Sequence, residues 1–377
     1  MPERPAPLAL VASPDGDQPF GSHAAVASNG KRMLAAELSR RLGRLGAAVA
    51  PLPASAREDV ADFHWGRWFV TAARRALTDA GGSVDAIGYS GGSAMALLAD
   101  TALDDLLSPV AGEVVANNRF SADAFVVAGD LQRAIDALEA CPTDNAAPRV
   151  LAEAGFAWRD LGAAPWARFD VDTTLDLALL RLATRLPGVR SLDPGVRGYL
   201  EMARVPGDRA LEVPQLERIG EVIRDRGGEL VVAGRIPGVT WQELETETAC
   251  RVRGFVEERG MRSARDPGSH PRSILAALMD RSSPAELVAE LSRLGDAVVL
   301  DSRVLMAARA SSSDASAWPP EEERLASDFG DASRIATPWL RELTDAAASA
   351  RIPFLLGGHA LVSDGLRLIV AAAWQGR

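Results

Sequence analysis

Three aspartates and two threonines stand close together in residues 168–177, whose sequence is RFDVDTTLDL. Phe169 and Val171 alternate with Asp170 and Asp172, and this period of two predicts the end of a β-strand. Carboxylates at the carboxyl end of a strand lie where open α/β sheets bind ligands. Such a pair can hold a divalent cation through hard oxygen ligands. The alternative is that both acids are solvated residues beside the start of a helix.

The second half of the same segment predicts that helix. Residues 175–180 are mostly apolar, and Thr173 or Thr174 can cap the helix N-terminus through a side-chain oxygen. Asp176 would lie in the first turn, where a negative charge interacts favourably with the helix dipole. The elements expected to position the carboxylates are therefore a strand and the helix that directly follows it.

The run FDVDTTLDL (169–177) resembles the DTP-x-DL element of nucleotidyltransferases of the molybdenum-cofactor, methylerythritol cytidylyltransferase and phospholactate guanylyltransferase kind. Thr174 stands where that element usually carries proline. Residues 144–156 are similar to the segment that precedes the element in those proteins. The resemblance covers roughly the first 200 residues. It implies a three-layer, Rossmann-like α/β domain of the nucleotide-diphospho-sugar transferase type.

The resemblance also implies an activity. Such a protein binds a nucleoside triphosphate with Mg²⁺ and transfers the nucleotidyl group to a small phosphorylated acceptor. Asp123 is then the first metal ligand, with Asp170 or Asp172 as the second, and Arg119 would stabilise the transferring phosphate. The neighbouring Asn117 and Asn118 would contribute to the nucleotide site. The alternative for residues 117–123 is a polar loop held by its own side-chain hydrogen bonds.

Two cations near the N-terminus are further candidates for phosphate binding. Residues 29–34 (NGKRML) resemble the GKPML turn of the same proteins, with Arg32 in place of proline. Lys31 and Arg32 would meet a phosphate at the N-terminus of a helix expected over residues 31–45. The alternative is that both are solvated residues at a helix start.

A second possible chemistry comes from residues 84–98. The sequence GYSGG fits the G-x-S-x-G nucleophile elbow of α/β-hydrolases, with Ser90 as nucleophile between a strand and a helix. Asp301 and His359 follow in the chain order of a hydrolase triad. In the competing interpretation, Gly91 and Gly92 let the backbone approach a base or ribose, because glycine lacks a side chain.

The composition limits the classes of function. The chain has 377 residues, 47% hydrophobic and 24% charged, which is typical of a globular protein of about two domains. Its net charge of -10 argues against binding nucleic acid through a basic surface. No apolar run approaches the roughly 20 residues of a membrane span. Two widely spaced cysteines, Cys141 and Cys250, predict reduced thiols in a cytoplasmic protein.

A cluster of proline and glycine between residues 192 and 213 predicts a domain boundary, with domains at 1–205 and 206–377. The second domain is expected to be a helix-rich α/β domain, with strands at 230–233 and 297–300 and a mostly helical segment at 234–261. It would shape the acceptor site or mediate a homodimer. We also expect Arg251, Arg253, Arg303 and His359 to converge on an anionic ligand, because arginine matches phosphate or carboxylate. A non-catalytic nucleotide- or metabolite-binding protein on the same fold is a third alternative.

Overall fold

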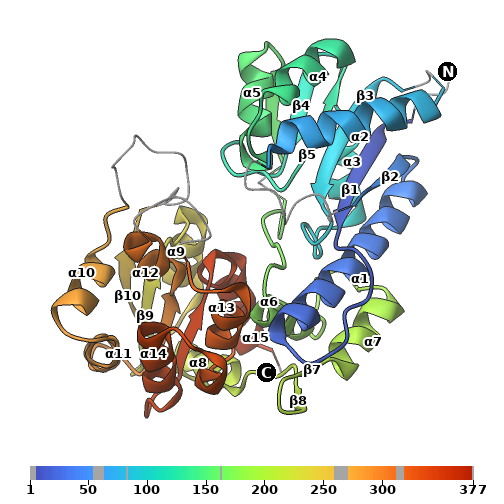
Figure 1. The fold of residues 1–377 in the computed structure, drawn as a ribbon. Coiled ribbons are helices and arrows are strands. Elements are labelled where there is room, and N and C mark those ends of the chain that lie inside the picture. Colours follow the sequence, from blue (N-terminus) through green and yellow to red (C-terminus); the bar gives the residue numbers. More distant parts are fainter. Residues whose placement is uncertain are drawn as a thin grey trace. The chain divides into compact units, whose positions relative to one another are not determined.

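The computed structural model describes residues 6–53, 63–81, 84–161, 164–258, 271–310 and 318–375 (Figure 1). The chain forms two compact units. Unit 1 consists of Met1–Pro19, Ser28–Val171 and Val189–Tyr199; unit 2 consists of Phe20–Ala27, Asp172–Gly188 and Leu200–Arg377. The chain passes from unit 1 to unit 2 for the last time between Tyr199 and Leu200, inside the boundary region expected at residues 192–213. The simple division at residue 205 misses two earlier segments, 20–27 and 172–188, which belong to unit 2.

Unit 1 is built on a six-stranded sheet with the order β2-β1-β3-β5-β4-β6. Its strands are β1 Leu8–Ser13, β2 Ala48–Pro53, β3 Ala86–Gly91, β4 Glu113–Ala116, β5 Ala124–Ala128 and β6 Ala157–Asp160. Strand β5 runs antiparallel to both of its neighbours, and all other pairs are parallel. The central strands are buried on both faces, which explains their continuous apolar sequences.

Helices cover both faces of this sheet. One face packs on α2 Trp65–Asp79, α4 Leu131–Glu139 and α5 Ala147–Glu153, and the other on α1 His23–Arg44 and α3 Asp100–Leu106. Trp65 of α2 stacks on Phe69 with ring centroids 4.9 Å apart, and both rings are fully buried. The aromatic residues of α2 therefore serve packing, as expected for tryptophans on an amphipathic helix.

Unit 2 is built on a four-stranded sheet in which every pair is parallel, with the order β10-β9-β11-β12. Its strands are β9 Glu229–Gly234, β10 Arg251–Val256, β11 Ala297–Asp301 and β12 Phe354–Gly357. One face packs on α10 Ile274–Arg281, α11 Pro284–Ser292, α12 Arg303–Arg309, α13 Glu321–Asp328 and α14 Pro338–Ala348.

Further helices complete unit 2. Helix α8 (Pro214–Arg224) packs on β9 and β11, and α15 (Leu366–Ala373) packs on α8, α6 (Thr174–Ala183) and α9 (Gly238–Glu247). A kinked helical segment, η5 (Leu361–Gly365), lies between β12 and α15. Helix α7 (Pro194–Met202) begins in unit 1 and ends in unit 2, and a short hairpin, β7 Arg204–Val205 with β8 Arg209–Ala210, follows it before α8.

The expectation of an α/β fold is confirmed, and the pairs in the two main sheets are mostly parallel. Three local predictions are wrong. Residues 170–172 are not in a strand, although Phe169 and Val171 are buried. Residues 251–256, expected to be helical, form the edge strand β10, where exposed arginines are common because an edge faces solvent. Helix α1 begins at His23, not at residue 31.

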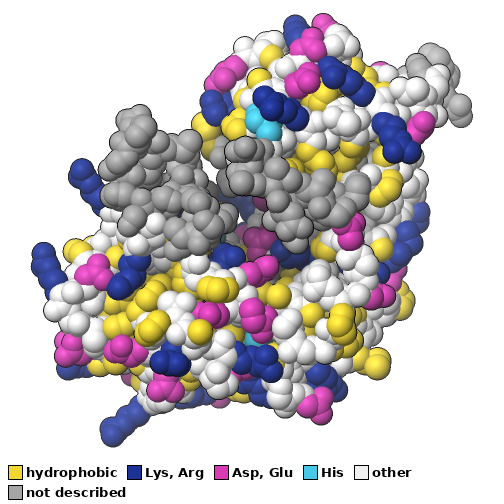
Figure 2. Space-filling model, viewed as in Figure 1, with side chains coloured by type: hydrophobic (Ala, Val, Ile, Leu, Met, Phe, Trp, Pro, Cys, Tyr) yellow, Lys and Arg dark blue, Asp and Glu magenta, His cyan; other side chains and the backbone are white. Residues whose placement is uncertain are grey.

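The surface carries charges of both signs. Figure 2 shows basic and acidic side chains interspersed over the face in view, among hydrophobic and neutral ones. Within the described residues, no helix is long and apolar enough to cross a membrane. Both cysteines are buried and unpaired with each other, as the sequence predicts.

Candidate functional site

The carboxyl edge of the unit 1 sheet gathers most of the predicted site residues. Strand β1 is flanked by β2 on one side and by β3 on the other, so the strand order reverses at β1. Ligands of open α/β sheets bind outside the carboxyl ends of the strands at such a switch point. The residues at this edge include Ser13, Gly91 and Asn117 from the parallel strands, and Asp123 at the start of antiparallel β5.

Asn117 organises this edge through its side chain. Its Oδ1 accepts the backbone N–H groups of Asp123 at 3.0 Å and Ala124 at 3.2 Å. Its Nδ2 donates to Asp123 Oδ2 at 3.1 Å and to the carbonyl oxygen of Ala167 at 3.1 Å. Asn117 is buried, so these bonds satisfy an amide that would otherwise be costly to bury. Asn117 therefore positions the Asp123 carboxylate and does not present its own amide to a ligand.

Two backbone bonds connect the rest of this edge. The Gly91 N–H donates to the Asp123 carbonyl at 2.8 Å, and the Met95 N–H donates to the Phe169 carbonyl at 3.0 Å. The end of β3, the start of β5 and the loop that leads to Asp170 are thus held together in unit 1. The structure brings together Gly91, Asn117, Asp123 and the segment before Asp170.

The carboxylates of unit 1 that are expected to hold a magnesium ion are those of Asp123 and Asp170. Asp123 uses Oδ2 for Asn117, and Asp170 uses Oδ1 for the Val171 N–H at 2.8 Å, so each carboxylate is already oriented. No cluster of three or more Asp, Glu, His or Cys residues in the described ranges forms a metal centre. Mg²⁺ commonly takes one or two protein carboxylates and completes its shell with water and phosphate oxygens. Two carboxylates suit that mode of binding.

Asp172 and Asp176 lie across the boundary, in unit 2. Thr173 caps α6 and forms a reciprocal capping box with Asp176, which confirms the predicted helix start. The Asp176 carboxylate accepts the N–H groups of Asp172 at 3.0 Å and Thr173 at 2.8 Å. Burial raises the pKa of Asp176 to about 7, and the nearby Asp172 carboxylate adds to the rise. Asp172 itself is exposed.

Lys31 and Arg32 are not at a helix N-terminus. They lie in the third turn of α1, where backbone N–H groups are used within the helix, so the predicted phosphate site at a helix start does not form. Arg32 instead pairs with Asp17, in the loop after β1. Asn29 fixes the same loop by accepting the Gln18 N–H at 2.9 Å and donating to the Gln18 carbonyl at 2.8 Å.

Residues 118–120 form a local turn. Asn118 Oδ1 accepts the Phe120 N–H at 3.2 Å, and the exposed Arg119 guanidinium lies 5.6 Å from the centre of the Phe120 ring. Asn118 is therefore used in an Asx-type turn, which was the alternative expectation for this loop. Arg119 is exposed and lies between Asn117 and Asp123 in the sequence, and its role towards a phosphate stays a prediction.

Ser90 does not form a nucleophile elbow. It lies inside β3, opposite Val11 of β1 and Ala124 of β5, and its Oγ donates to the Gly91 carbonyl at 2.9 Å. The residues after β3 form turns, and the next helix, α3, starts at Asp100. An elbow needs the serine in a sharp turn between strand and helix, so the expected geometry is missing.

Unit 2 has a polar cluster at the carboxyl edge of its own sheet. Arg235 follows β9, and its Nε and Nη2 donate to the two carboxylate oxygens of Asp301 at 2.6 and 3.0 Å. Asp301 ends β11 and is fully buried. Burial raises the pKa of Asp301, but the Arg235 guanidinium outweighs it and holds the pKa below its usual range. Arg235 was not among the predicted site residues, although its position directly after the apolar strand segment 230–234 indicates a strand end.

Arg303 continues this cluster. It follows β11, and its guanidinium donates to both oxygens of Asp328 at 2.7 and 2.5 Å. His359, which follows β12, lies close enough to Asp301 to interact with its charge. Arg251, by contrast, begins β10 and pairs with Glu229 at the amino edge of the sheet. Arg303 and His359 therefore both follow strands at the carboxyl edge, whereas Arg251 and Arg253 lie within β10 and do not join them. Binding of an anionic ligand by Arg303 and His359 stays a prediction.

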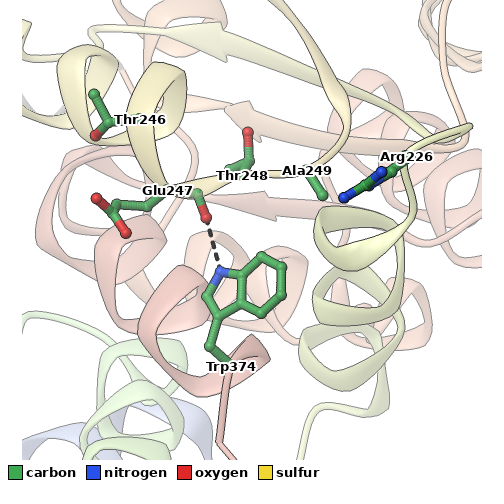
Figure 3. A pocket seen from close by; sticks show the side chains of 6 residues that line it. All are labelled: Arg226, Thr246, Glu247, Thr248, Ala249 and Trp374. Carbon is green, nitrogen blue, oxygen red and sulfur yellow. Dashed lines mark hydrogen bonds between the residues drawn. The ribbon is translucent and has the colours of Figure 1, made fainter.

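A surface hollow of about 550 Å³ lies on the amino side of the same sheet. Arg226, the segment 246–249 and Trp374 line it, and the Trp374 Nε1–H donates to the Glu247 carbonyl at 2.7 Å (Figure 3). These residues precede β9 and β10 or end the chain. The hollow is therefore separate from the polar cluster at the carboxyl edge.

Comparison of the chain with protein-family models, curated proteins and solved structures finds no match.

Proposed function

We propose that unit 1 binds a nucleoside triphosphate with Mg²⁺ and transfers its nucleotidyl group to a small phosphorylated acceptor. The observation that carries the proposal is the Asn117 side chain, which orients Asp123 and tethers the segment that leads to Asp170. Two oriented carboxylates beside the switch point of a mainly parallel sheet suit a metal–triphosphate ligand. A sheet with helices on both faces is compatible with the nucleotide-diphospho-sugar transferase type that the sequence resembles.

The residues of unit 1 have distinct roles in this proposal. Asp123 and Asp170 hold the metal ion, which when bound supplies positive charge to the phosphates and the leaving pyrophosphate. The backbone at Gly91 and Gly92 approaches the nucleoside, and the loop fixed by Asn29 and Arg32 lies at the end of β1. Arg119 supplies charge to the transferring phosphate. Catalysis then rests on positioning and electrostatic stabilisation, without a covalent intermediate.

Thermal stability in the presence of nucleoside triphosphates tests the proposal. A ligand that binds the native state stabilises it by about 2.7 kcal/mol at a hundredfold excess over Kd. We expect at least one triphosphate to raise the unfolding temperature only when Mg²⁺ is present. Asp123→Asn should abolish this rise. Asp104→Asn, which changes an exposed acid on α3, is the matched control and should keep it. If no triphosphate raises the unfolding temperature of the wild-type chain, the proposal is wrong.

A further inference from the structure

The sheet of unit 2 has a switch point of its own. Strand β9 comes first in the sequence, β10 pairs with one side of it and β11 with the other. Ligands bind outside the carboxyl ends of strands at such a reversal. Here those ends carry Arg235, Asp301 and, on the next strand, His359. This edge is distinct from the edge of unit 1 to which the nucleotide is assigned.

Helix α9 starts directly beside this switch point. It has ten residues and follows β9 after three, and its N-cap, Pro237, makes no side-chain hydrogen bond. The N–H groups of the first turn therefore have no side-chain cap, and they carry the positive end of the helix dipole. Gly238 and Val239, the first two residues of the helix, are exposed. An anionic group is the natural partner of such a helix start.

Two buried polar atoms near this helix start have no hydrogen-bond partner in the described part of the chain. Thr240 is fully buried in the first turn of α9, and its Oγ1 makes no hydrogen bond. Asp364 of η5 is 4% exposed. Its Oδ1 accepts from Arg367 Nη1 at 2.7 Å, whereas its Oδ2 is buried without a partner. Such atoms are rare because each costs the desolvation energy of a polar group.

The two atoms belong to elements that are in contact, α9 and η5. Arg367 donates to Glu243 of α9 and to Asp364 of η5, so Glu243 lies on the face of α9 that is turned to η5. Thr240 precedes Glu243 by three residues, and side chains with this spacing share one helix face. Helix α9 and η5 are in contact, and η5 also contacts β9 and β11.

The segment η5 is kinked, because Ser363 within it has non-helical angles of φ -107° and ψ -116°. Across the switch point, Asp301 occupies Nε and Nη2 of Arg235, so Nη1 is directed away from that carboxylate. This part of unit 2 thus has hydrogen-bond donors in the first turn of α9 and in the Arg235 guanidinium, together with the buried Thr240 hydroxyl and Asp364 carboxylate.

We propose that this edge of unit 2 binds a small hydroxylated molecule that carries a phosphate or carboxylate group. The anionic group lies at the start of α9 beside Arg235 Nη1. A hydroxyl group of the ligand donates to Asp364 Oδ2 and accepts from the Thr240 hydroxyl, so both buried atoms gain a partner. The site is independent of the nucleotide proposed for unit 1.

Calorimetric titration of the full chain tests this site with three probes. Glycerol 3-phosphate and glycerate each carry both groups, and inorganic phosphate carries the anion alone. We expect glycerol 3-phosphate or glycerate to bind, and the better of the two identifies the anionic group. Inorganic phosphate should bind at least about tenfold more weakly, because it lacks the hydroxyl contact. Failure of both hydroxylated probes to bind at millimolar concentration would overturn the proposal.

Isosteric variants separate a ligand contact from a structural defect. Thr240→Val should raise the unfolding temperature of the free protein and weaken binding of the hydroxylated probe by about tenfold. Ser292→Ala removes another buried, unpartnered hydroxyl of unit 2 and should raise the unfolding temperature without changing binding. Asp123→Asn, which changes a carboxylate of the nucleotide site proposed for unit 1, should leave probe binding unchanged. The result of the titration therefore does not depend on the nucleotide proposal. Equal binding by wild type and Thr240→Val would refute the site.

Discussion

Arg303 and Asp328 form a bidentate ion pair inside unit 2, with N–O distances of 2.7 and 2.5 Å. Their side chains are 9% and 0% exposed. Burial lowers the pKa of Arg303, but the Asp328 carboxylate outweighs it and raises the pKa above its usual value. The pair connects the start of α12, just after β11, to the end of α13. Neither charge has access to bulk water.

Removal of one partner should therefore be strongly destabilising. We expect Asp328→Ala to lower the free energy of unfolding by about 3–5 kcal/mol, because the Arg303 charge stays buried without its partner. Asp280→Ala breaks the exposed pair with Arg309, which has a similar distance of 2.6 Å, and should cost less than about 1 kcal/mol. Urea denaturation of both variants measures the difference. Equal losses would show that burial does not set the strength of the Arg303 pair.

Glycine 92 should not tolerate a side chain. A Cβ at Gly92 would lie 2.1 Å from the Ala12 carbonyl oxygen and 2.4 Å from Ala35 Cβ, so β1 and α1 would have to move apart. We expect Gly92→Ala to destabilise the protein by about 1–3 kcal/mol or more. Gly43→Ala, with open space around it in α1, should stabilise by up to about 1 kcal/mol through helix propensity. Thermal unfolding distinguishes the two, and a harmless Gly92→Ala would contradict the close packing.

Stability should fall in mild acid because of His23. This side chain is fully buried, and burial lowers its pKa, although the Glu322 and Asp331 carboxylates oppose the shift. As the pH falls below about 6.5, the unfolded chain binds a proton that the folded chain does not, so the free energy of unfolding decreases. The stability that neutral His23 contributes is fully present above about pH 6.5. Chemical denaturation across this pH range measures the slope, which should become shallower in His23→Gln. An unchanged slope would assign the acid sensitivity to other groups.

Ser90 should be unreactive towards serine-hydrolase reagents. The Ser90 residue is 5% exposed inside β3. Its hydroxyl proton is directed to the Gly91 carbonyl oxygen, which is not a catalytic base. We expect a fluorophosphonate probe to leave the native protein unlabelled. Labelling that disappears in Ser90→Ala would reverse this conclusion and restore the hydrolase alternative.

Local sequence determined several elements closely. Strand β5 begins and ends where its apolar run does, and β4 adds only Glu113 to the apolar run 114–116, since both runs are short and bounded by polar residues. The start of α6 follows from Thr173 and Asp176, because a capping box depends on side chains and backbone only three residues apart. The sequence also predicted that site residues cluster within 117–123, because Asn117 and Asp123, which bond to each other, are only six residues apart.

Tertiary structure decided the features that depend on pairing between distant segments. The charged segment 251–256 becomes a strand because it pairs with β9, and Gly254 leaves room for the Trp241 ring, 2.4 Å from the place of a Cβ. Arg235 and Asp301 are 66 residues apart and meet because β9 and β11 are neighbours in the sheet. Local periodicity indicates which residues are buried, but it does not indicate which strands pair. The fold therefore decides which charges meet at a strand edge, and with them the composition of each candidate site.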